Sequence, residues 1–414
     1  MIQEFINKNF YYLFLFTLIF GVMFYDAIRF NYTDEICVLL LLVLYVYHVV
    51  QTKNWEFSKL FLVVLAVFVF YLGYSFWIGS NAKKAIVMDF IIQIKPYLGF
   101  FCAYSIAPRF NKSQKLILQQ IVIIFTLYLL GIGIMSLVNG DIMDLLLGHE
   151  SRFATAVSIL ALLYLYSVDY SVKDKFFFIL ILAIGLFSTR SKFYGFLAIS
   201  IFMVIYINDK FRLQFNLKNT LFLLVAVAGT LFVAREKIYY YFVEGGFGSG
   251  REVDDLYARM ALYYYSIPLF VDYFPFGSGF ATYATFTSGE YYSPIYGKYG
   301  MDRMHGLTEA DPAFIADTYY PALAQFGVVG VVLFFLFWIH LLKKTVGVFK
   351  WGYNKEAVLM LLVIVFFLIE CTSDATITHN RGVFMMMFLG LVYAEAKGQI
   401  VSGEKQKPIP AVEL

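Results

Sequence analysis

Residues 319–342 read YYPALAQFGVVGVVLFFLFWIHLL, and these 24 residues include no Asp, Glu, Lys or Arg. The hydrocarbon core of a bilayer is about 30 Å thick and needs roughly 20 apolar residues in helical form. The stretch is therefore predicted to cross a membrane as a helix. Twelve runs of this kind are predicted along the chain, at 9–27, 35–51, 59–79, 86–108, 116–138, 152–169, 175–189, 191–208, 219–236, 319–342, 356–373 and 377–396.

The composition excludes the common soluble classes of protein. The 414 residues are 61% hydrophobic, 20% aromatic and only 15% charged, whereas soluble domains contain about 25% charged residues. An ordinary soluble enzyme, a disordered chain and a nucleic-acid-binding module are excluded, and a net charge of +3 implies no polyanion partner. The three cysteines show no spacing typical of a disulfide framework or a zinc site (Cys37, Cys102, Cys371). We therefore predict an all-α membrane protein of about twelve spans.

The distribution of Lys and Arg predicts how the spans are oriented. With the N-terminus inside, the inner segments hold eighteen of these residues and the short outer loops hold seven. Such an excess is typical of the cytoplasmic side, so both termini are predicted to be cytoplasmic. Residues 1–236 then carry spans one to nine, 237–318 form a large outer loop, 319–396 carry the last three spans, and 397–414 are a cytoplasmic tail.

The outer loop at 237–318 is the segment most suited to a specific function, because long loops in compact proteins are usually functional. We expect a helix over 252–267, ended by the proline that follows it. Asp255 and Arg259 are four residues apart on that helix and could pair. The sequence PFGSG at 275–279 predicts a tight turn whose glycines permit a close approach of backbone segments.

Outward cations are the first group of candidate site residues. Arg190 lies in a short outer turn between hydroxyl-bearing residues. A guanidinium group there can bind phosphate oxygens through two parallel hydrogen bonds, although a cation at a helix end can also simply reach the membrane surface. Arg152, Arg303 and Arg381 are further outer cations. Several cations at one membrane face favour an anionic ligand more strongly than any single one does.

Lys95 and the acid–base candidates form a second group. A buried cation in a span, as predicted for Lys95, indicates a functional site, or else a structural pair with Asp89 or an acid on another helix. Asp317 stands directly before the tenth span, where a carboxylate could accept a proton from a hydroxyl. His305 is the only histidine of the large loop, although a lone loop histidine is more often solvated. The sequence has no metal-ligand spacing, nucleophile motif or phosphate-binding glycine loop.

Three local features then occur in a recognisable order. Ser188-Thr189-Arg190-Ser191 opens an apolar span, and Arg259 precedes Pro268 and the turn at 275–279 in the outer loop. Asp317-Thr318-Tyr319-Tyr320 then leads into a span that contains Gly327 and Gly330. This order resembles the O-antigen ligase and O-antigen polymerase superfamily. The resemblance covers residues 180–340 best, and the first 150 residues match only in hydropathy.

The resemblance implies a GT-C-like membrane glycosyltransferase that uses neither a metal nor a cofactor. Its donor and acceptor would be glycans on undecaprenyl pyrophosphate, at the outer face of a bacterial inner membrane. Arg190 and Arg259 match the family arginines that hold the pyrophosphate, and Arg152, Arg303, Lys95 and Tyr319 are further candidates for substrate binding. The implied partners are membrane lipid, with room for a chain-length regulator and a flippase, and no nucleic acid.

One departure from the family pattern bears on the reaction. The ligases carry a His-Asn pair ahead of the glycine-containing span, whereas this chain has Ala316-Asp317 there. That difference favours a polymerase, which joins lipid-linked repeat units, over a ligase that transfers glycan to lipid A core. It leaves the catalytic base open between Asp317, His305 and no base at all. A lipid-linked glycan flippase is the alternative from another class, but it predicts repeated halves and interrupted spans, whereas the sequence shows no repeat and only Lys95-Pro96 as an interruption.

Overall fold

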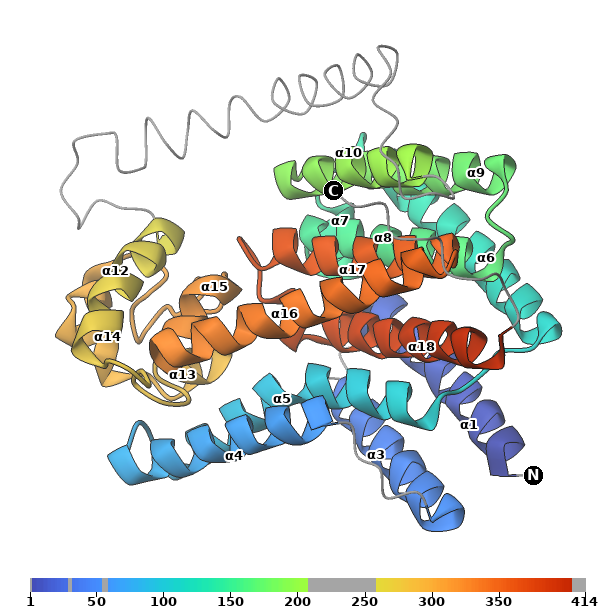
Figure 1. Ribbon diagram of the computed structural model, residues 1–414. Coiled ribbons are helices and arrows are strands. Elements are labelled where there is room, and N and C mark those ends of the chain that lie inside the picture. The colour runs from blue at the N-terminus through green and yellow to red at the C-terminus, as the bar shows by residue number, and fades with distance from the viewer. Residues whose placement is uncertain (1, 29–31, 54–58, 208–257, 404–414) are drawn as a thin grey trace.

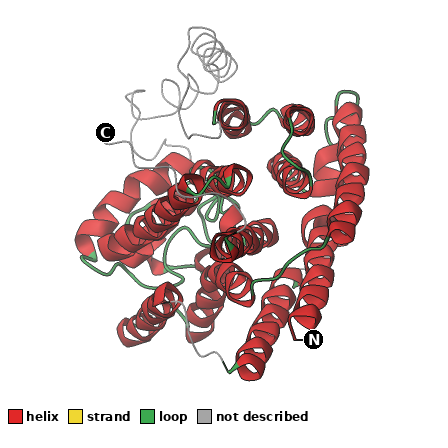
Figure 2. Cartoon of the chain, turned by 45° about the vertical axis from the view of Figure 1, so that its right-hand side comes forward, coloured by secondary structure: helices red, strands yellow, loops and turns green. Residues whose placement is uncertain are grey.

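A computed structural model describes residues 2–28, 32–53, 59–207 and 258–403, and this part of the chain is helical, without strands (Figures 1 and 2). Seven helical segments within it are long and apolar enough to cross a membrane. They are α1 with the π-helical turn η1 (Ile2–Phe16 and Thr17–Met23), α3 (Thr33–Thr52), α4 (Lys59–Ile78), α5 (Lys83–Ile106), α6 (Lys112–Ser136), α15–η6–α16 (Tyr319–Ala322, Leu323–Phe326 and Gly327–Lys350) and α18 (Asn380–Ser402). The predicted all-α membrane fold class is confirmed at this level.

The remaining predicted runs fall mostly on shorter helices. These are α8 (Glu150–Ser167), α9 with η2 (Val172–Ala183 and Ile184–Ser188), α10 (Ser191–Tyr206) and α17 (Asn354–Glu370). The short helices α2 (Tyr25–Ile28) and α7 (Ile142–Leu147) lie in connections. The run predicted at 219–236 lies outside the described residues, so the count of twelve spans stays a prediction.

Helix α18 lies at the centre of the bundle and packs closely against α5 (Figure 1). Most of its residues are buried, including the apolar stretch from Val383 to Leu389. The two helices approach so closely that a Cβ atom on Gly390 would lie 2.3 Å from the carbonyl oxygen of Phe100. Pro96 lies inside α5, yet the helix continues through it. The sequence interruption at Lys95-Pro96 is therefore not a break in the helix.

The connections between helices gather at two ends of the bundle. At one end, Asp26 pairs with Arg152 and Ser151 donates to Asp374, while Asn81 Nδ2 donates to the carbonyl of Ala281 at 2.6 Å. At the other end, Lys115 Nζ lies 2.7 Å from Glu395, and the Arg109 N–H donates to Asn7 at 3.0 Å. The first end, called the loop end below, contains the connections predicted to face outward. Its orientation in a membrane stays a prediction.

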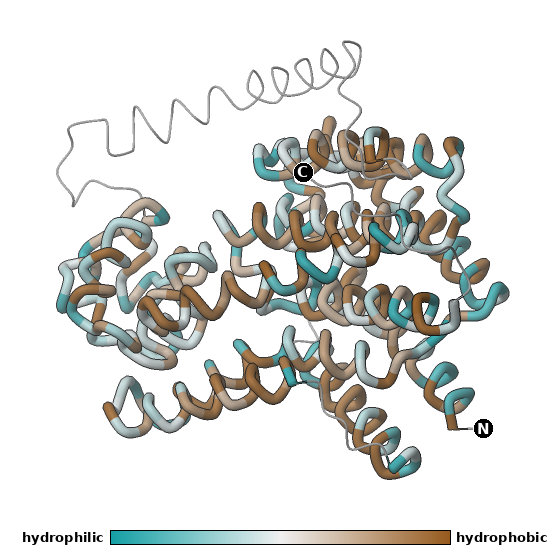
Figure 3. The backbone as a smooth tube through the Cα atoms, in the orientation of Figure 1, coloured by the Kyte–Doolittle hydropathy of each residue, from teal (hydrophilic) through white to brown (hydrophobic). Residues whose placement is uncertain are grey.

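The described part of the long loop predicted at 237–318 forms a lobe at the loop end (Figure 1). Its helices are α12 (Ala258–Asp272), α13 (Phe286–Glu290), α14 (Pro294–Lys298) and η5 (Met301–Arg303). They share a small core of their own, in which Leu262, Leu269 and Tyr283 are fully buried. Figure 3 shows that the residues of the lobe are on the whole more hydrophilic than those of α4 and α16 beside it.

The predicted end of the loop helix at Pro268 is wrong. Pro268 lies inside α12, which continues to Asp272, while residues 252–257 of the prediction lie outside the described residues. A proline inside a helix removes one backbone hydrogen bond and strains the preceding turn. Leu269, directly after it, is completely buried in the lobe core. We attribute the continuation of the helix to this burial.

The predicted glycine turn is confirmed as a point of close backbone approach. Gly277 and Gly327 both have positive φ, 79° and 61°, which side-chain-bearing residues rarely adopt. A Cβ atom on Gly277 would lie 2.3 Å from the backbone nitrogen of Gly327. The Gly279 N–H also donates to the carbonyl of Gln325 at 2.8 Å. These contacts fix the lobe to the start of α16.

Candidate functional site

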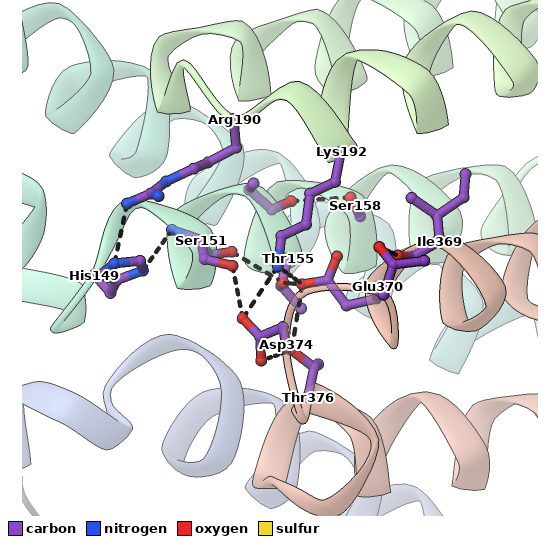
Figure 4. Close-up of polar contacts among 12 residues, drawn as sticks. His149, Ser151, Thr155, Ser158, Arg190, Lys192, Ile369, Glu370, Asp374 and Thr376 are labelled. Atoms are coloured by element: carbon purple, nitrogen blue, oxygen red, sulfur yellow. Dashed lines mark hydrogen bonds and ion pairs between the residues drawn. The ribbon is translucent and has the colours of Figure 1, made fainter. Parts of the chain in front are cut away.

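A buried network around Lys192 connects three helices at the loop end (Figure 4). Lys192 lies in the first turn of α10, and its Nζ atom lies 2.8 Å from Glu370 Oε1 and 3.1 Å from Asp374 Oδ2. Glu370 ends α17, and Asp374 lies in the loop that leads to the short 3₁₀ helix η7 (Thr376–Thr378) and α18. The side chains of Lys192 and Glu370 are only 12% and 8% exposed. One cation therefore neutralises part of a buried pair of carboxylates.

Hydroxyl groups complete the hydrogen bonds of this network. Asp374 accepts from Ser151 Oγ at 2.9 Å and from Thr376 Oγ1 at 2.7 Å. Burial raises the pKa of Asp374, but Lys192, His379 and these hydroxyls outweigh burial, so the pKa of Asp374 lies well below its ordinary value. Asp374 is thus a stable anion and a poor base.

Arg190 approaches the same region from the turn before α10. Its guanidinium pairs with Glu150, and Nη2 lies 3.0 Å from His149 Nε2. The Ser151 N–H donates to Nδ1 of the same ring at 3.2 Å. Partial desolvation, with the nearby charge of Arg190, lowers the pKa of His149 below its ordinary value, which favours the neutral ring.

The ring of His149 cannot accept from both neighbours. A neutral imidazole has one acceptor nitrogen and one N–H donor. If Nδ1 accepts from Ser151, then Nε2 carries the proton and faces another donor on Arg190. An anionic oxygen beside the two nitrogens, within hydrogen-bond distance of both, would accept from His149 and from Arg190. This geometry suits an anion better than it suits the two side chains alone.

Asp317 and Arg259 lie beside the Lys192 network, on the side of the lobe. Together with Arg190 and the Lys192 network they are called the charged cluster below. Their side chains pair directly, and both are about one-third exposed. Burial raises the pKa of Asp317 above its ordinary value, although Arg259 acts in the opposite direction, and the charges of Asp374 and Lys192 also act on it. The Tyr263 hydroxyl donates to the carbonyl of Thr372 at 2.7 Å, which holds α12 over the loop that contains Asp374. The pair therefore adjoins the Lys192 network. Asp255, the partner expected for Arg259, lies outside the described residues.

Two other predicted cations share one carboxylate. Asp26 pairs with Arg152 and with Arg381, whose Nη2 atom lies 2.8 Å from Asp26 Oδ2. Arg381 is buried, whereas the side chain of Arg152 is nearly half exposed. These residues tie α2, α8 and α18 together and place Arg152 at the edge of the cluster.

Lys95 is held inside the bundle by acids of another helix. Its Nζ atom lies 2.6 Å from Asp34 Oδ2 and also pairs with Glu35, both on α3. Asp89 instead accepts from the N–H of Ala281 at 2.7 Å. The Asn380 amide, with its nitrogen toward Asp34, lies 2.8 Å from Oδ1. These contacts favour the structural interpretation of Lys95 over a role in substrate binding.

His305 and Arg303 differ from the other candidates in their position. The side chain of His305 is 86% exposed, 3.5 Å from Asp311 Oδ2, and its ring lies against Phe314. Arg303 is also exposed, on η5. Both side chains point to solvent from the lobe. Among the contacts that the structure records, neither residue contacts the charged cluster.

Tyr319 lies at the head of an apolar cavity between α4, α5 and α16. The cavity has a volume of about 410 Å³, and Gln93, Tyr319 and Phe280 line one end, whereas His340 and Lys343 line the other. The Tyr319 hydroxyl donates to Gln93 Oε1 at 3.2 Å. Along α16, the lining runs from Phe326 to Lys343, about 25 Å at the usual helical rise.

The cavity opens sideways toward the space that lipid would occupy. Three of its lining residues, Val63, Leu336 and Ile339, are also exposed on the outer surface of α4 and α16. Tyr319 and Tyr320 are fixed by backbone hydrogen bonds to the carbonyl of Cys371 at 3.3 and 3.2 Å. The head of the cavity therefore adjoins the charged cluster through residues 317–319.

Sequence reasoning missed Glu370 and Asp374. Glu370 is a lone acid inside the predicted apolar run 356–373, and an ionisable residue in a span is a signal in its own right. Asp374 and Thr376 lie in a short connection between two apolar runs, where the sequence has no motif that marks a site. Among the described residues, no group of three or more His, Cys, Asp or Glu is placed to hold a metal ion.

Comparison with known proteins does not assign the chain to a family. No protein-family model matches it, and no curated protein matches its sequence.

Proposed function

We propose that this protein is a membrane glycosyltransferase that joins oligosaccharide repeat units carried on a polyprenyl pyrophosphate such as undecaprenyl pyrophosphate. The products would be O-antigen or a capsular or extracellular polysaccharide. One observation carries the proposal: a cluster of cations, each paired with a carboxylate, lies at the loop end beside the head of an apolar cavity that opens at its side. A substrate with an anionic diphosphate and a long hydrocarbon tail needs both features next to each other.

The cation cluster fits a diphosphate leaving group. When the acceptor hydroxyl attacks the anomeric carbon, the bond from that carbon to the diphosphate oxygen breaks and the electron pair stays on the diphosphate. Fixed guanidinium and ammonium groups near a low-dielectric boundary stabilise this developing charge. Arg190, Lys192 and Arg259 are the candidates, and the donor pair formed by Arg190 and His149 suits one phosphate oxygen.

The acceptor proton must leave as the new glycosidic bond forms. Asp317 is placed to receive it, because its carboxylate lies partly exposed at the junction of lobe and bundle. Its present partner is Arg259. If a phosphate oxygen replaces Asp317 as the ion-pair partner of Arg259, then Asp317 loses its counterion. Its carboxylate would become more basic at the moment the donor is bound. His305 is the weaker candidate, since its side chain faces solvent.

The apolar cavity fits the hydrocarbon tail of the donor. Its length of about 25 Å along α16 is comparable to the apolar thickness of a bilayer, which is about 30 Å. The side opening between α4 and α16 would let a tail enter from the membrane without leaving it.

The test is reconstitution of the full-length protein in lipid nanodiscs with lipid-linked repeat units extracted from the source cells. A ladder of glycan lengths on a gel supports the polymerase. Transfer of single units onto lipid A core would instead indicate a ligase. Movement of lipid-linked glycan across a vesicle membrane without new glycosidic bonds would indicate a flippase and would overturn the proposal.

A further inference from the structure

Helix α12 exposes an apolar face where a helix in water would be polar. Ile267, Val271 and Phe274 are 61%, 73% and 71% exposed. Ile267 and Val271 are four residues apart on one side of α12, and Phe274 follows in the turn after the helix. We propose that this face, formed by Ile267, Val271 and Phe274, lies in the interfacial region of the lipid bilayer. The lobe would then rest on the membrane instead of standing in water.

The opposite face of the same helix is also apolar. Ala261, Leu262 and Leu269 are completely buried in the lobe core. A helix at the surface of a soluble domain normally carries polar residues on its outer face. Contiguous exposed apolar surface marks an interaction site. Both faces of α12 are therefore apolar. The lobe core covers one face, and the other face would be stable only against another apolar environment, such as lipid.

The exposed face continues the surface of a membrane-spanning helix. The carbonyl oxygen of Pro275, next to Phe274, accepts from the N–H of Val329 in the first turn of α16 at 3.3 Å. Val328 and Val332 on the outer side of α16 are 41% and 50% exposed. This α16 surface belongs to a segment long and apolar enough to cross the membrane. Lipid that surrounds this part of α16 would therefore also contact Phe274.

A neighbouring tryptophan marks the level of the membrane interface. Trp77, near the end of α4, is highly exposed, and Trp is enriched at membrane–water interfaces. Its neighbour Tyr74 donates to the carbonyl of Gly277 at 2.9 Å, and the rings of Tyr74 and Phe276 lie 5.9 Å apart. The turn after α12 is thus fixed at the level of Trp77.

Polar groups beside the apolar face suit the headgroup layer. Asp272 accepts from Lys298 Nζ and from the Tyr299 hydroxyl, each at 2.9 Å. The Lys298 ammonium also lies 4.6 Å from the ring centre of Tyr273. Lys and Tyr side chains with an apolar body and a polar tip are typical of helices that lie in the interface. The inference stands independently of the proposed enzymatic function.

The experiment is site-directed spin labelling of the full-length protein in liposomes of phosphatidylethanolamine and phosphatidylglycerol. The native cysteines, Cys37, Cys102 and Cys371, are buried in the fold, so a new surface cysteine is labelled selectively. Val271→Cys is the test variant, with Glu309→Cys, at an exposed polar position of the same loop, as the control. Collision rates with oxygen, which concentrates in lipid, are compared with those of a water-soluble nickel chelate.

We expect the oxygen-to-nickel collision ratio to exceed one for Val271→Cys and to fall below one for Glu309→Cys. A ratio for Val271→Cys equal to that of the control would place the face in water and overturn the inference. Low collision with both reagents would mean that protein covers the face, which also overturns it. Ile267→Cys repeats the measurement one turn earlier, in case Val271→Cys does not give a monodisperse protein.

Discussion

Replacement of Lys192 by methionine tests the buried network most directly. The change removes the cation that lies 2.8 Å from Glu370 and 3.1 Å from Asp374, and it keeps a flexible apolar side chain of similar length. Removal of one partner from a buried ion pair costs about 3–5 kcal/mol, because the remaining charge is left uncompensated. The variant can reduce that cost by protonating one carboxyl group.

The free energy needed to protonate one carboxyl group depends on pH, and it sets how much the variant is destabilised. Protonation at pH 7 of a glutamic acid with an ordinary pKa of about 4.3 costs about 3.7 kcal/mol, at 1.36 kcal/mol per unit. At pH 5 the same protonation costs about 1 kcal/mol. In the variant, the folded state holds a proton that the unfolded state releases, so its stability rises as the pH falls from 7 to 5. The contribution of Asp374 in the unchanged protein does not vary in this window, because its pKa is lowered well below it.

The assay is thermal unfolding of the purified protein in detergent at pH 5, 6 and 7. Lys115→Met is the matched control, since Lys115 pairs with Glu395 at 2.7 Å at the other end of the bundle and both side chains are more exposed. We expect Lys192→Met to be the more destabilising at pH 7 and the two variants to converge at pH 5. Adding Glu370→Gln to Lys192→Met should restore part of the stability at pH 7. Equal and pH-independent losses for both lysines would refute the reasoning.

Three further predictions concern the proposed activity and the turn of the lobe. Arg190→Lys keeps the charge but loses the planar fork, so glycan ladder formation should fall at least about tenfold, as for a lost charge-assisted contact of about 1.4 kcal/mol or more, with normal protein yield; full activity would remove Arg190 from the site. Asp317→Asn should slow polymerisation by about 10²–10⁴-fold if Asp317 is the base, whereas His305→Ala should have little effect; the reverse result would transfer the role to His305. Gly277→Ala should prevent folding, because its Cβ would lie 2.3 Å from the backbone nitrogen of Gly327. Gly300→Ala, also at positive φ but in open space, should lower the stability measured by thermal unfolding by only about 1 kcal/mol. Equal losses of stability for the two variants would contradict the packing argument.

Hydropathy alone predicted most of the fold. Eleven of the twelve apolar runs coincide with helical segments, and the twelfth, at 219–236, lies outside the described residues. A helix that crosses a bilayer needs about 20 apolar residues, so hydropathy identifies such segments directly. The error at Pro268 has a different origin. Sequence rules give the local cost of a proline, whereas the burial of Leu269 depends on residues far along the chain, such as Tyr283.

The structure brings together only some of the residues that the sequence singled out as site candidates. Arg190 and Asp317 were found because they flank apolar runs, and Arg259 because it is a cation on the predicted loop helix that matches the family pattern. The structure places all three at one end of the bundle. No sequence rule pairs Arg259 with Asp317 or Lys192 with Asp374, since these pairs depend on how loops meet at the end of the bundle. Glu370 could have been found as a lone acid in an apolar run.

The pairing of the cations has a consequence for how an anionic substrate would bind. Arg190, Lys192 and Arg259 each have a carboxylate partner already. A diphosphate must therefore replace carboxylates instead of filling vacant positions. The binding affinity would then be the difference between the free energy of the cation–phosphate pairs and that of the cation–carboxylate pairs. In the empty site the carboxylates keep the cations oriented and neutralised, which matters because an unpaired charge in a low-dielectric environment is costly. In the proposed reaction this exchange would also set an order, because Asp317 would be released from Arg259 only when the diphosphate has arrived. A base that becomes free after donor binding would act on an acceptor hydroxyl only when there is a leaving group to displace.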